Sequence, residues 1–369
     1  MKISRIAQVG AVAAVAALAL AGCASNETPA GDNTDAPESN LSGEIAGGGA
    51  SSQEVAVQAW TAGFQTANPD VTITYDPAGS GAGRESFQAG AFPFAGSDRA
   101  FTVEEIEEGP FDACVEGSGI VELPTYISPI AVIFNVEGVD SLNLDAATMA
   151  GLFAGTITNW NDPAIAALNP DATLPDLAVT PVHRADDSGT TENFTDYLFQ
   201  AAPDVWTSEP DGVWPLASGE AAQGTSGVVS AVAGGNGTIG YADASRAAEE
   251  GLSTAAVKVG EEFVEYSPEA AAAIVDASPF EEGRGEADLA IELQRTSTEA
   301  GVYPIVLISY MIACQEYVDA SVAPIVKGYL EYVASPDGQD AAAEAAGSAP
   351  ISDTLRAQVD AAIDTIVTE

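Results

Sequence analysis

The stretch that decides how this chain is interpreted is His183-Arg184-Ala185-Asp186-Asp187-Ser188-Gly189-Thr190-Thr191-Glu192-Asn193-Phe194. Arg184 precedes a Ser-Gly-Thr turn, after which the apolar spacing of Phe194, Tyr197 and Leu198 predicts a helix. A helix start exposes unpaired N–H groups and the positive end of the helix dipole, so the hydroxyls and guanidinium of this stretch suit an oxyanion. Because Ser and Thr are common helix caps, an ordinary capped helix with a surface Arg is the alternative interpretation.

The charge balance limits the classes of partner. The chain has 369 residues, long enough for two domains, with 11 Lys and Arg against 55 Asp and Glu, a net charge of −44. The basic patch that nucleic-acid binding needs is absent from the composition, so DNA or RNA is not an expected partner. The electric field of so negative a protein repels small anions at long range. An anion site here therefore has to work through short-range hydrogen bonds and local dipoles.

The N-terminus has the pattern of an export signal. Lys2 and Arg5 precede an apolar run over residues 9–21, too short for a comfortable membrane span, and the run ends at Leu20-Ala21-Gly22-Cys23. These small residues before Cys23 resemble a bacterial lipobox, in which the Cys becomes the lipid-modified first residue. We therefore expect a lipoprotein signal peptide over 1–22, lipid such as palmitate on Cys23, and anchoring to the outer face of the bacterial cell membrane.

Residues 23–41 are polar and rich in Pro, Gly, Asn and acid, which predicts a disordered tether between lipid and domain. Removal of the leader takes away Lys2 and Arg5, so the mature net charge is −44 − 2 = −46. Cys114 and Cys314 then remain, either as one disulfide of an exported protein or as two buried free thiols. Neither lies in a C-x-x-C motif, so a metal site is not expected.

The rest of the chain predicts α/β architecture. Residues 71–75 alternate like a strand, 79–83 form a Gly-rich helix start, and 94–98 resemble another strand end. Thr102-x-x-Glu105 matches a capping box for the helix that follows. Serines thus lie at helix starts that follow strands, so we expect a site at the carboxyl ends of the strands.

Two long apolar runs are candidates for crossings between domains. Residues 122–135 are β-branched and contain two prolines, and residues 303–308 form a second strand-like run. Residues 243–300, rich in Ala, Glu and Ser, are expected to be mostly helical.

Taken together, these motifs resemble the substrate-binding lipoproteins of phosphate-specific ABC transporters. The matching segments are Gly47–Trp60, Gly79–Gly83, Gly96–Asp98, Ile157–Pro163, His183–Leu198 and Gly224–Ala242. The resemblance implies a two-lobed, periplasmic-binding-protein-like (type II) α/β fold with hinge strands and the ligand in the cleft. It places lobe I at 42–126 plus 304–369 and lobe II at 127–303, and it implies a monomer that delivers inorganic phosphate to ABC permease subunits, without cofactor, metal or enzymatic activity.

The resemblance also assigns residue roles. It assigns phosphate contacts to Ser51, Ser52, Ser80, Asp98, Arg184, Ser188, Gly189 and Thr190. Asp186 matches an acid that orients the Arg, and Cys114 and Cys314 fall in one lobe, as a disulfide requires. Ser51-Ser52 is a departure, since many members of the family have Thr-Phe there.

The chemistry of these residues favours phosphate. Phosphate at neutral pH keeps at least one proton, whereas sulfate keeps none, so a buried carboxylate can accept a hydrogen bond from phosphate and would repel sulfate. We therefore expect Asp98 to determine specificity, by supplying the repulsive element that discrimination often needs.

Several alternatives remain open at this stage. They are a receptor of the same fold for molybdate, tungstate or sulfate, and a phosphate sensor without a transport role. A serine hydrolase using Ser188 and His183, the single histidine, is the least favoured, because the chain lacks a Gly-x-Ser-x-Gly elbow.

Overall fold

A computed structural model describes residues 41–368. They belong to one compact unit, Ser39–Glu369. The predicted signal peptide, the lipid attachment at Cys23 and all of the tether except Leu41 lie outside the described residues. Among the helices that the structure describes, none combines the length and the apolar character needed to cross a bilayer.

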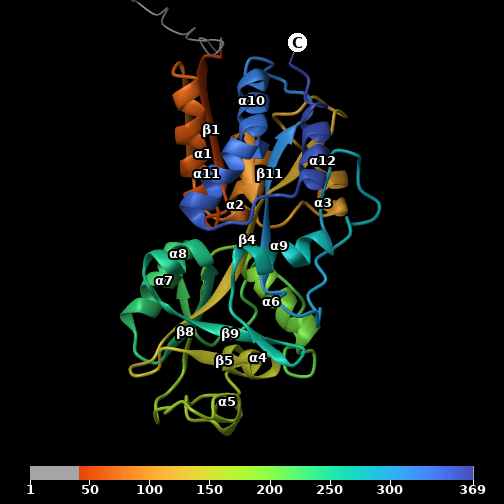
Figure 1. Ribbon diagram of the computed structural model, residues 1–369. Helices are drawn as coiled ribbons and strands as arrows, with labels where there is room; N and C mark the ends of the chain where they lie inside the picture. Colours follow the sequence, from red (N-terminus) through yellow and green to blue (C-terminus); the bar gives the residue numbers. More distant parts are fainter. Residues whose placement is uncertain (1–40, 369) are drawn as a thin grey trace, which may run out of the picture. The chain divides into compact units, whose positions relative to one another are not determined.

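The described chain forms a mixed sheet with helices packed on it (Figure 1). The strands are β1 (Gly43–Gly49), β2 (Val71–Asp76), β3 (Phe94–Ser97), β4 (Ile120–Asn135), β5 (Leu142–Leu144), β6 (Thr180–Arg184), β7 (Glu220–Ala222), β8 (Thr238–Asp243), β9 (Ser253–Val259), β10 (Glu262–Val264) and β11 (Val306–Cys314). The helices are α1 (Glu54–Ala67), α2 (Ser80–Gln88), α3 (Val103–Glu108), α4 (Ala146–Ala154), α5 (Pro163–Leu168), α6 (Gly189–Ala201), α7 (Gly224–Gly234), α8 (Ala244–Glu249), α9 (Pro268–Asp276), α10 (Ala323–Ala334), α11 (Pro336–Ala346) and α12 (Asp353–Ile363).

The strand order explains why the polar residues at the starts of several helices come together at one edge of the sheet. Hydrogen-bonded neighbours run β2-β1-β3-β11-β4-β8-β6-β7, and β9 pairs with β4, β5 and β10. Strands β1, β2 and β3 are mutually parallel, as are β6, β7 and β8, whereas β4 and β11 run antiparallel to their neighbours. Each parallel group presents the carboxyl ends of its strands at one edge, where loops that bind ligands are typically found.

Strand β4 joins the two parallel groups. Its first part, residues 120–129, pairs with β11, and residues 130–135 pair with β8. Every residue of β4 except Asn135 is buried. A strand covered on both faces reads as a nearly continuous apolar run, which is why the sequence predicted a crossing here. The predicted return run over 303–308 leads into β11, which is buried along its whole length.

Helices pack against both parallel groups of strands. Helices α1, α10, α11 and α12 gather beside β1 and β11, and α7 and α8 lie beside β8, as Figure 1 shows. The capping box predicted at Thr102 and Glu105 forms at the start of α3. Cys114 and Cys314 are joined in a disulfide at the end of β11.

The expectation of a mostly helical segment over 243–300 is wrong. This segment contains the short helices α8 and α9, the hairpin of β9 and β10, and an irregular stretch that leads to β11. Ala255, Val257 and Val259 alternate with more exposed neighbours along β9 and face the core. That alternation is the period of a strand, and it outweighs the helical preference of Ala and Glu.

Candidate functional site

Four helices start where strands end, and their first residues meet at one place. Strand β1 leads into α1, β2 into α2, β6 into α6 and β7 into α7. Backbone hydrogen bonds and side-chain contacts tie these starts together, as when Gly81 N–H donates to the carbonyl of Asp187 at 3.3 Å. Because each helix start carries unpaired N–H groups and a positive partial charge, their convergence suits a small anion.

Asp98, which directly follows β3, lies at the centre of this convergence. Its side chain is buried, with 3% exposed. Ser52 Oγ donates to both carboxylate oxygens, at 2.6 and 2.7 Å, and Thr190 Oγ1 donates to Oδ2 at 2.9 Å. The backbone N–H of Asp98 donates to Ser80 Oγ at 3.1 Å. Three predicted site residues that are far apart in the sequence therefore contact Asp98 directly.

Opposing effects act on the Asp98 carboxyl. Burial raises its pKa above the ordinary value, because a dry surrounding disfavours the charged form. Hydrogen bonds from Ser52 and Thr190 and the positive charge of Arg184 act in the opposite direction, because they stabilise the carboxylate. The result is a buried acid with a raised pKa that is nevertheless surrounded by donors.

Arg184, at the end of β6, is held in place by Asp186. Its Nε donates to Asp186 Oδ1 at 2.8 Å and a terminal nitrogen donates to Oδ2, while Gly224 N–H donates to Oδ1 at 3.0 Å. Burial alone would raise the pKa of Asp186, but the hydrogen bond and charge of Arg184 lower it below the ordinary value. The pair is a two-pronged, charge-assisted contact that holds the guanidinium in one orientation. The prediction that Asp186 orients Arg184 for a ligand concerns this pair.

The hydroxyls of Ser80 and Ser188 accept hydrogen bonds and donate none among the described contacts, which leaves their protons available. Ser80 Oγ accepts from Asp98 N–H, and Ser188 Oγ caps α6 by accepting from Thr191 N–H at 3.2 Å. Ser51 Oγ accepts from the N–H of Thr225 at 3.2 Å and lies 3.0 Å from its hydroxyl. A hydroxyl has one proton, so an oxygen that only accepts can still donate to a ligand.

Gly189 contributes space rather than a functional group. A Cβ added to it would lie 2.5 Å from Asp98 Cβ and 2.9 Å from Ser80 Oγ. Any other residue here would separate the start of α6 from the end of β3. Glycine thus allows the two helix starts to approach.

Thr225 and Asn193 belong to the site but were not predicted. Besides contacting Ser51, Thr225 Oγ1 lies 3.5 Å from the Arg184 guanidinium. Asn193 Nδ2 donates to the carbonyls of Asp98 and Gly189, at 2.7 and 2.9 Å. The sequence carried a signal for each: Thr225 lies at the start of the matching segment Gly224–Ala242, and Asn193 lies one helical turn after Gly189.

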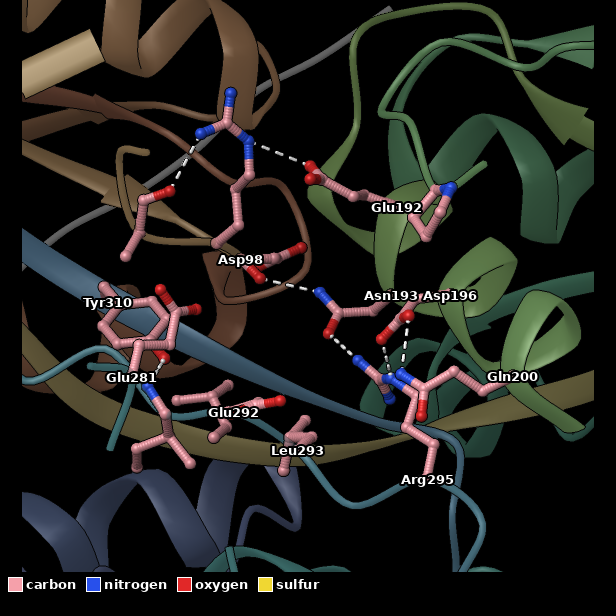
Figure 2. Close-up of a pocket in the computed structure, with 15 residues that line it drawn as sticks. Asp98, Glu192, Asn193, Asp196, Gln200, Glu281, Glu292, Leu293, Arg295 and Tyr310 are labelled. Atoms are coloured by element: carbon pink, nitrogen blue, oxygen red, sulfur yellow. Dashed lines mark hydrogen bonds and ion pairs between the residues drawn. The ribbon is translucent and has the colours of Figure 1, made fainter. Parts of the chain in front are cut away.

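A cavity of about 250 Å³ lies on another side of Asp98 (Figure 2). Its lining includes the acidic side chains of Glu192, Asp196, Glu281 and Glu292. Asn193 links Asp98 to Arg295, whose guanidinium also contacts Asp196. This acid-rich lining does not suit an anion, so the candidate anion site is the convergence of helix starts.

The arrangement does not form a hydrolase triad. His183 Nδ1 lies 2.9 Å from the carbonyl of Arg184, and the ring stacks on Trp214 with centroids 4.9 Å apart. Ser188 Oγ is used as a helix cap instead of contacting the imidazole. Over residues 41–368, no group of three or more His, Cys, Asp and Glu side chains has the geometry to hold a metal ion.

Comparison with known proteins places this geometry in a family. Residues 34–337 match a model described as a PBP superfamily domain. The chain is 32% identical to the phosphate-binding protein PstS 2 of Mycobacterium tuberculosis over 329 residues, covering 88% of this chain and 87% of that protein. It is 33% identical to PstS 3 of Mycobacterium leprae over 366 residues, covering 94% and 95%.

Solved structures agree on the fold. A phosphate-binding protein from Stenotrophomonas maltophilia superposes with a TM-score of 0.65 at 23% identity, covering 87% of this chain and 94% of that one. A periplasmic phosphate-binding protein solved with phosphate, PfluDING, superposes with a TM-score of 0.68 at 22% identity, covering 86% and 93%.

Proposed function

Because the chain belongs to the PBP superfamily and, within it, to the family of the PstS phosphate-binding proteins, we propose that it binds inorganic phosphate for uptake. The observation that carries the proposal is Asp98, a buried carboxylate surrounded by helix starts and hydroxyls. The donors attract any oxyanion, whereas the Asp98 carboxylate accepts a hydrogen bond from a P–OH group that phosphate has and sulfate lacks.

The predicted residues take distinct roles in this proposal. Ser80 and Ser188 have protons to donate to phosphate oxygens, and Ser51 joins them through a hydroxyl that lies 3.0 Å from the Thr225 hydroxyl. Arg184 supplies a charge-assisted bond while Asp186 holds its orientation. Gly189 and its neighbours contribute backbone N–H groups at the start of α6. Ser52 and Thr190 contact the ligand site through Asp98.

We further propose the division into lobe I, 42–126 plus 304–369, and lobe II, 127–303. It is supported by the exchange of partners along β4, which pairs with β11 up to Pro129 and with β8 from Ile130. The contacts of Ser51 with Thr225 and of Thr190 with Asp98 then bridge the lobes. A ligand held by both lobes would favour closure of the cleft about β4 and β11.

The proposal extends to location and partners. The lipobox-like sequence at Cys23 supports export, removal of 1–22, lipid attachment and residence on the outer face of the cell membrane. The protein then acts as a monomeric receptor, without enzymatic activity, that delivers phosphate to the permease of an ABC importer. The naming of its relatives as phosphate-binding proteins supports this role.

Calorimetric titration of the mature protein with phosphate and, in parallel, with sulfate and molybdate tests the function. We expect saturable phosphate binding at one site and no heat from sulfate at the same concentration. Binding of molybdate or sulfate in preference to phosphate would replace the proposal with a receptor for another oxyanion. Hydrolysis of a chromogenic ester or phosphoester would contradict the absence of enzymatic activity.

A further inference from the structure

The Ser52 hydroxyl has a different hydrogen-bonding role from the other serines of the site. Its side chain is 0% exposed, and its Oγ lies 2.6 and 2.7 Å from the two carboxylate oxygens of Asp98. A carboxylate can only accept, so the single hydroxyl proton of Ser52 is directed at Asp98. Ser52 cannot donate that proton to an anion without releasing Asp98.

Ser51 provides the contrast one residue earlier. Its Oγ accepts from the backbone N–H of Thr225 and has no hydrogen bond to Asp98 among the described contacts. The two adjacent serines are both buried, at 6% and 0% exposed, yet they face different parts of the site. Their chemistry is identical, so a difference between them in function has to come from position.

We propose that Ser52 is a positioning residue for selectivity: its hydroxyl keeps the Asp98 carboxylate ionised and oriented toward the anion site, so that unprotonated oxyanions are rejected. The inference rests on the proposed binding of phosphate. Ser52 and Asp98 both belong to the proposed lobe I, so this contact does not depend on closure of the cleft. The contact from Thr190 comes from the proposed lobe II and depends on the two lobes meeting.

The surroundings of Asp98 explain why such a donor is needed. Burial raises the pKa of Asp98, and the nearby carboxyl of Asp243 and phenol of Tyr75 provide no compensating positive charge. The hydroxyls of Ser52, Ser309 and Thr190 favour the carboxylate, with the Ser52 hydrogen bond as the largest of these effects, and Arg184 adds a positive charge. Without that bond Asp98 would gain a proton at a higher pH, and a protonated Asp98 would donate to sulfate instead of repelling it.

Sulfate titrations across pH test this role, because sulfate itself does not change protonation between pH 4 and 8. Sulfate and phosphate affinities of the wild type, Ser52→Ala, Ser51→Ala and Ser52→Thr are measured by calorimetry at half-unit pH steps. In Ser52→Ala we expect sulfate binding to begin about one pH unit higher than in the wild type and phosphate to bind about 10-fold more weakly at pH 8. Ser51→Ala loses phosphate affinity without moving the pH at which sulfate binds.

Ser52→Thr retains the hydroxyl, so its sulfate profile is expected to match that of the wild type even if the added methyl group weakens binding overall. A sulfate profile in Ser52→Ala that coincides with the wild type or with Ser51→Ala would overturn the proposal. So would a shifted profile in Ser52→Thr. Absence of phosphate binding by the wild type would instead refute the proposed function, and the two failures are thereby distinguished.

Discussion

Single residues determine what the site attracts and what it rejects. Arg184 and the serines that only accept hydrogen bonds offer donors to any oxyanion. We expect Asp98 to distinguish one oxyanion from another, because a buried carboxylate needs a donor and repels a ligand that has none. Attraction and rejection therefore belong to different side chains, and each is open to a separate test.

We expect Asp98→Asn to lose discrimination against sulfate. The amide retains an acceptor and gains a donor, so sulfate is no longer repelled and phosphate loses its charge-assisted bond. Phosphate affinity is expected to fall about 10- to 100-fold and sulfate binding to become measurable by calorimetry. Rejection of sulfate at the wild-type level would remove Asp98 from the selectivity mechanism.

Arg184→Ala is expected to lower phosphate affinity by about 10-fold or more, because a charged donor is lost and the Asp186 carboxylate loses its partner. The matched control is Arg246→Ala on α8, which removes an Arg that is paired with Glu249 at 2.8 Å. Calorimetry on both variants separates a local contact from a change in net charge. Equal affinities for the two variants would show that Arg184 does not contact the ligand.

At the scale of elements, the site depends on how closely helix starts approach strand ends. Helix α6 reaches the end of β3 because Gly189 has no side chain, and α2 meets the Asp187 loop through Gly81. Such approaches bring the N–H groups of several helices to one point, which no single helix provides.

Gly189→Ala is therefore expected to keep α6 away from β3. The new Cβ would lie 2.5 Å from Asp98 Cβ and 3.0 Å from Asp98 Cα, and backbone cannot yield as a flexible side chain does. We expect phosphate affinity to fall by about 10-fold or more, since a small displacement of several donors costs more than one hydrogen bond.

Gly234→Ala in α7 is the matched control for this substitution. Nothing lies within 4 Å of the Cβ it would add. Because Gly234 is the last residue of α7 and an added methyl group meets no neighbour, thermal stability and affinity are both expected to stay unchanged. A loss of affinity in Gly234→Ala equal to that in Gly189→Ala would contradict the steric argument.

At the scale of the whole molecule, acidic groups are buried as well as exposed. Asp243, at the end of β8, is 0% exposed and accepts from the Tyr126 hydroxyl on β4 at 3.1 Å. Burial raises the pKa of Asp243 from 3.8 to about 6, against the hydrogen bonds from Ser245. The folded protein therefore holds a proton on Asp243 more tightly than the unfolded chain does.

Because folding raises the pKa of Asp243, protonation of this residue makes the folded protein more stable at low pH than at high pH. The contribution of the Asp243 proton is fully present below the unfolded pKa and is lost as pH rises through the folded pKa, from about pH 4 to about pH 6. Asp243→Asn keeps an acceptor and cannot titrate. The free energy of unfolding of the wild type should therefore fall relative to the variant by up to about 3 kcal/mol across that window.

Urea unfolding of both proteins at pH 4, 5, 6 and 7, with the disulfide intact, measures this difference. Other carboxyls titrate over the same range, so the difference between variant and wild type is the informative quantity, and it should be level from pH 7 upward. A difference that does not change with pH would show that folding does not raise the pKa of Asp243.

Much of the fold could be predicted from local patterns. The α/β alternation, the capping box at Thr102 and the buried crossing strand follow from periodicity and turn chemistry, and the structure contains all three. The segment 243–300 was misjudged because its composition favours helix, whereas the alternation along β9 decides which side chains face the core. Amino-acid composition predicts secondary structure less well than the spacing of apolar residues does, because that spacing shows which face of a helix or strand is buried.

The sequence by itself determined the helix starts, the donors that they carry and the presence of an acid after β3. Only the tertiary structure decided that Ser52, 46 residues before Asp98, and Thr190, 92 residues after it, both donate to that acid, while Ser51 faces Thr225. Local patterns specify neighbours within about one helical turn, whereas these contacts exist because β3 lies between the two helix starts. The same His183–Phe194 stretch is therefore a capped helix by its sequence and one wall of the proposed anion site by its position.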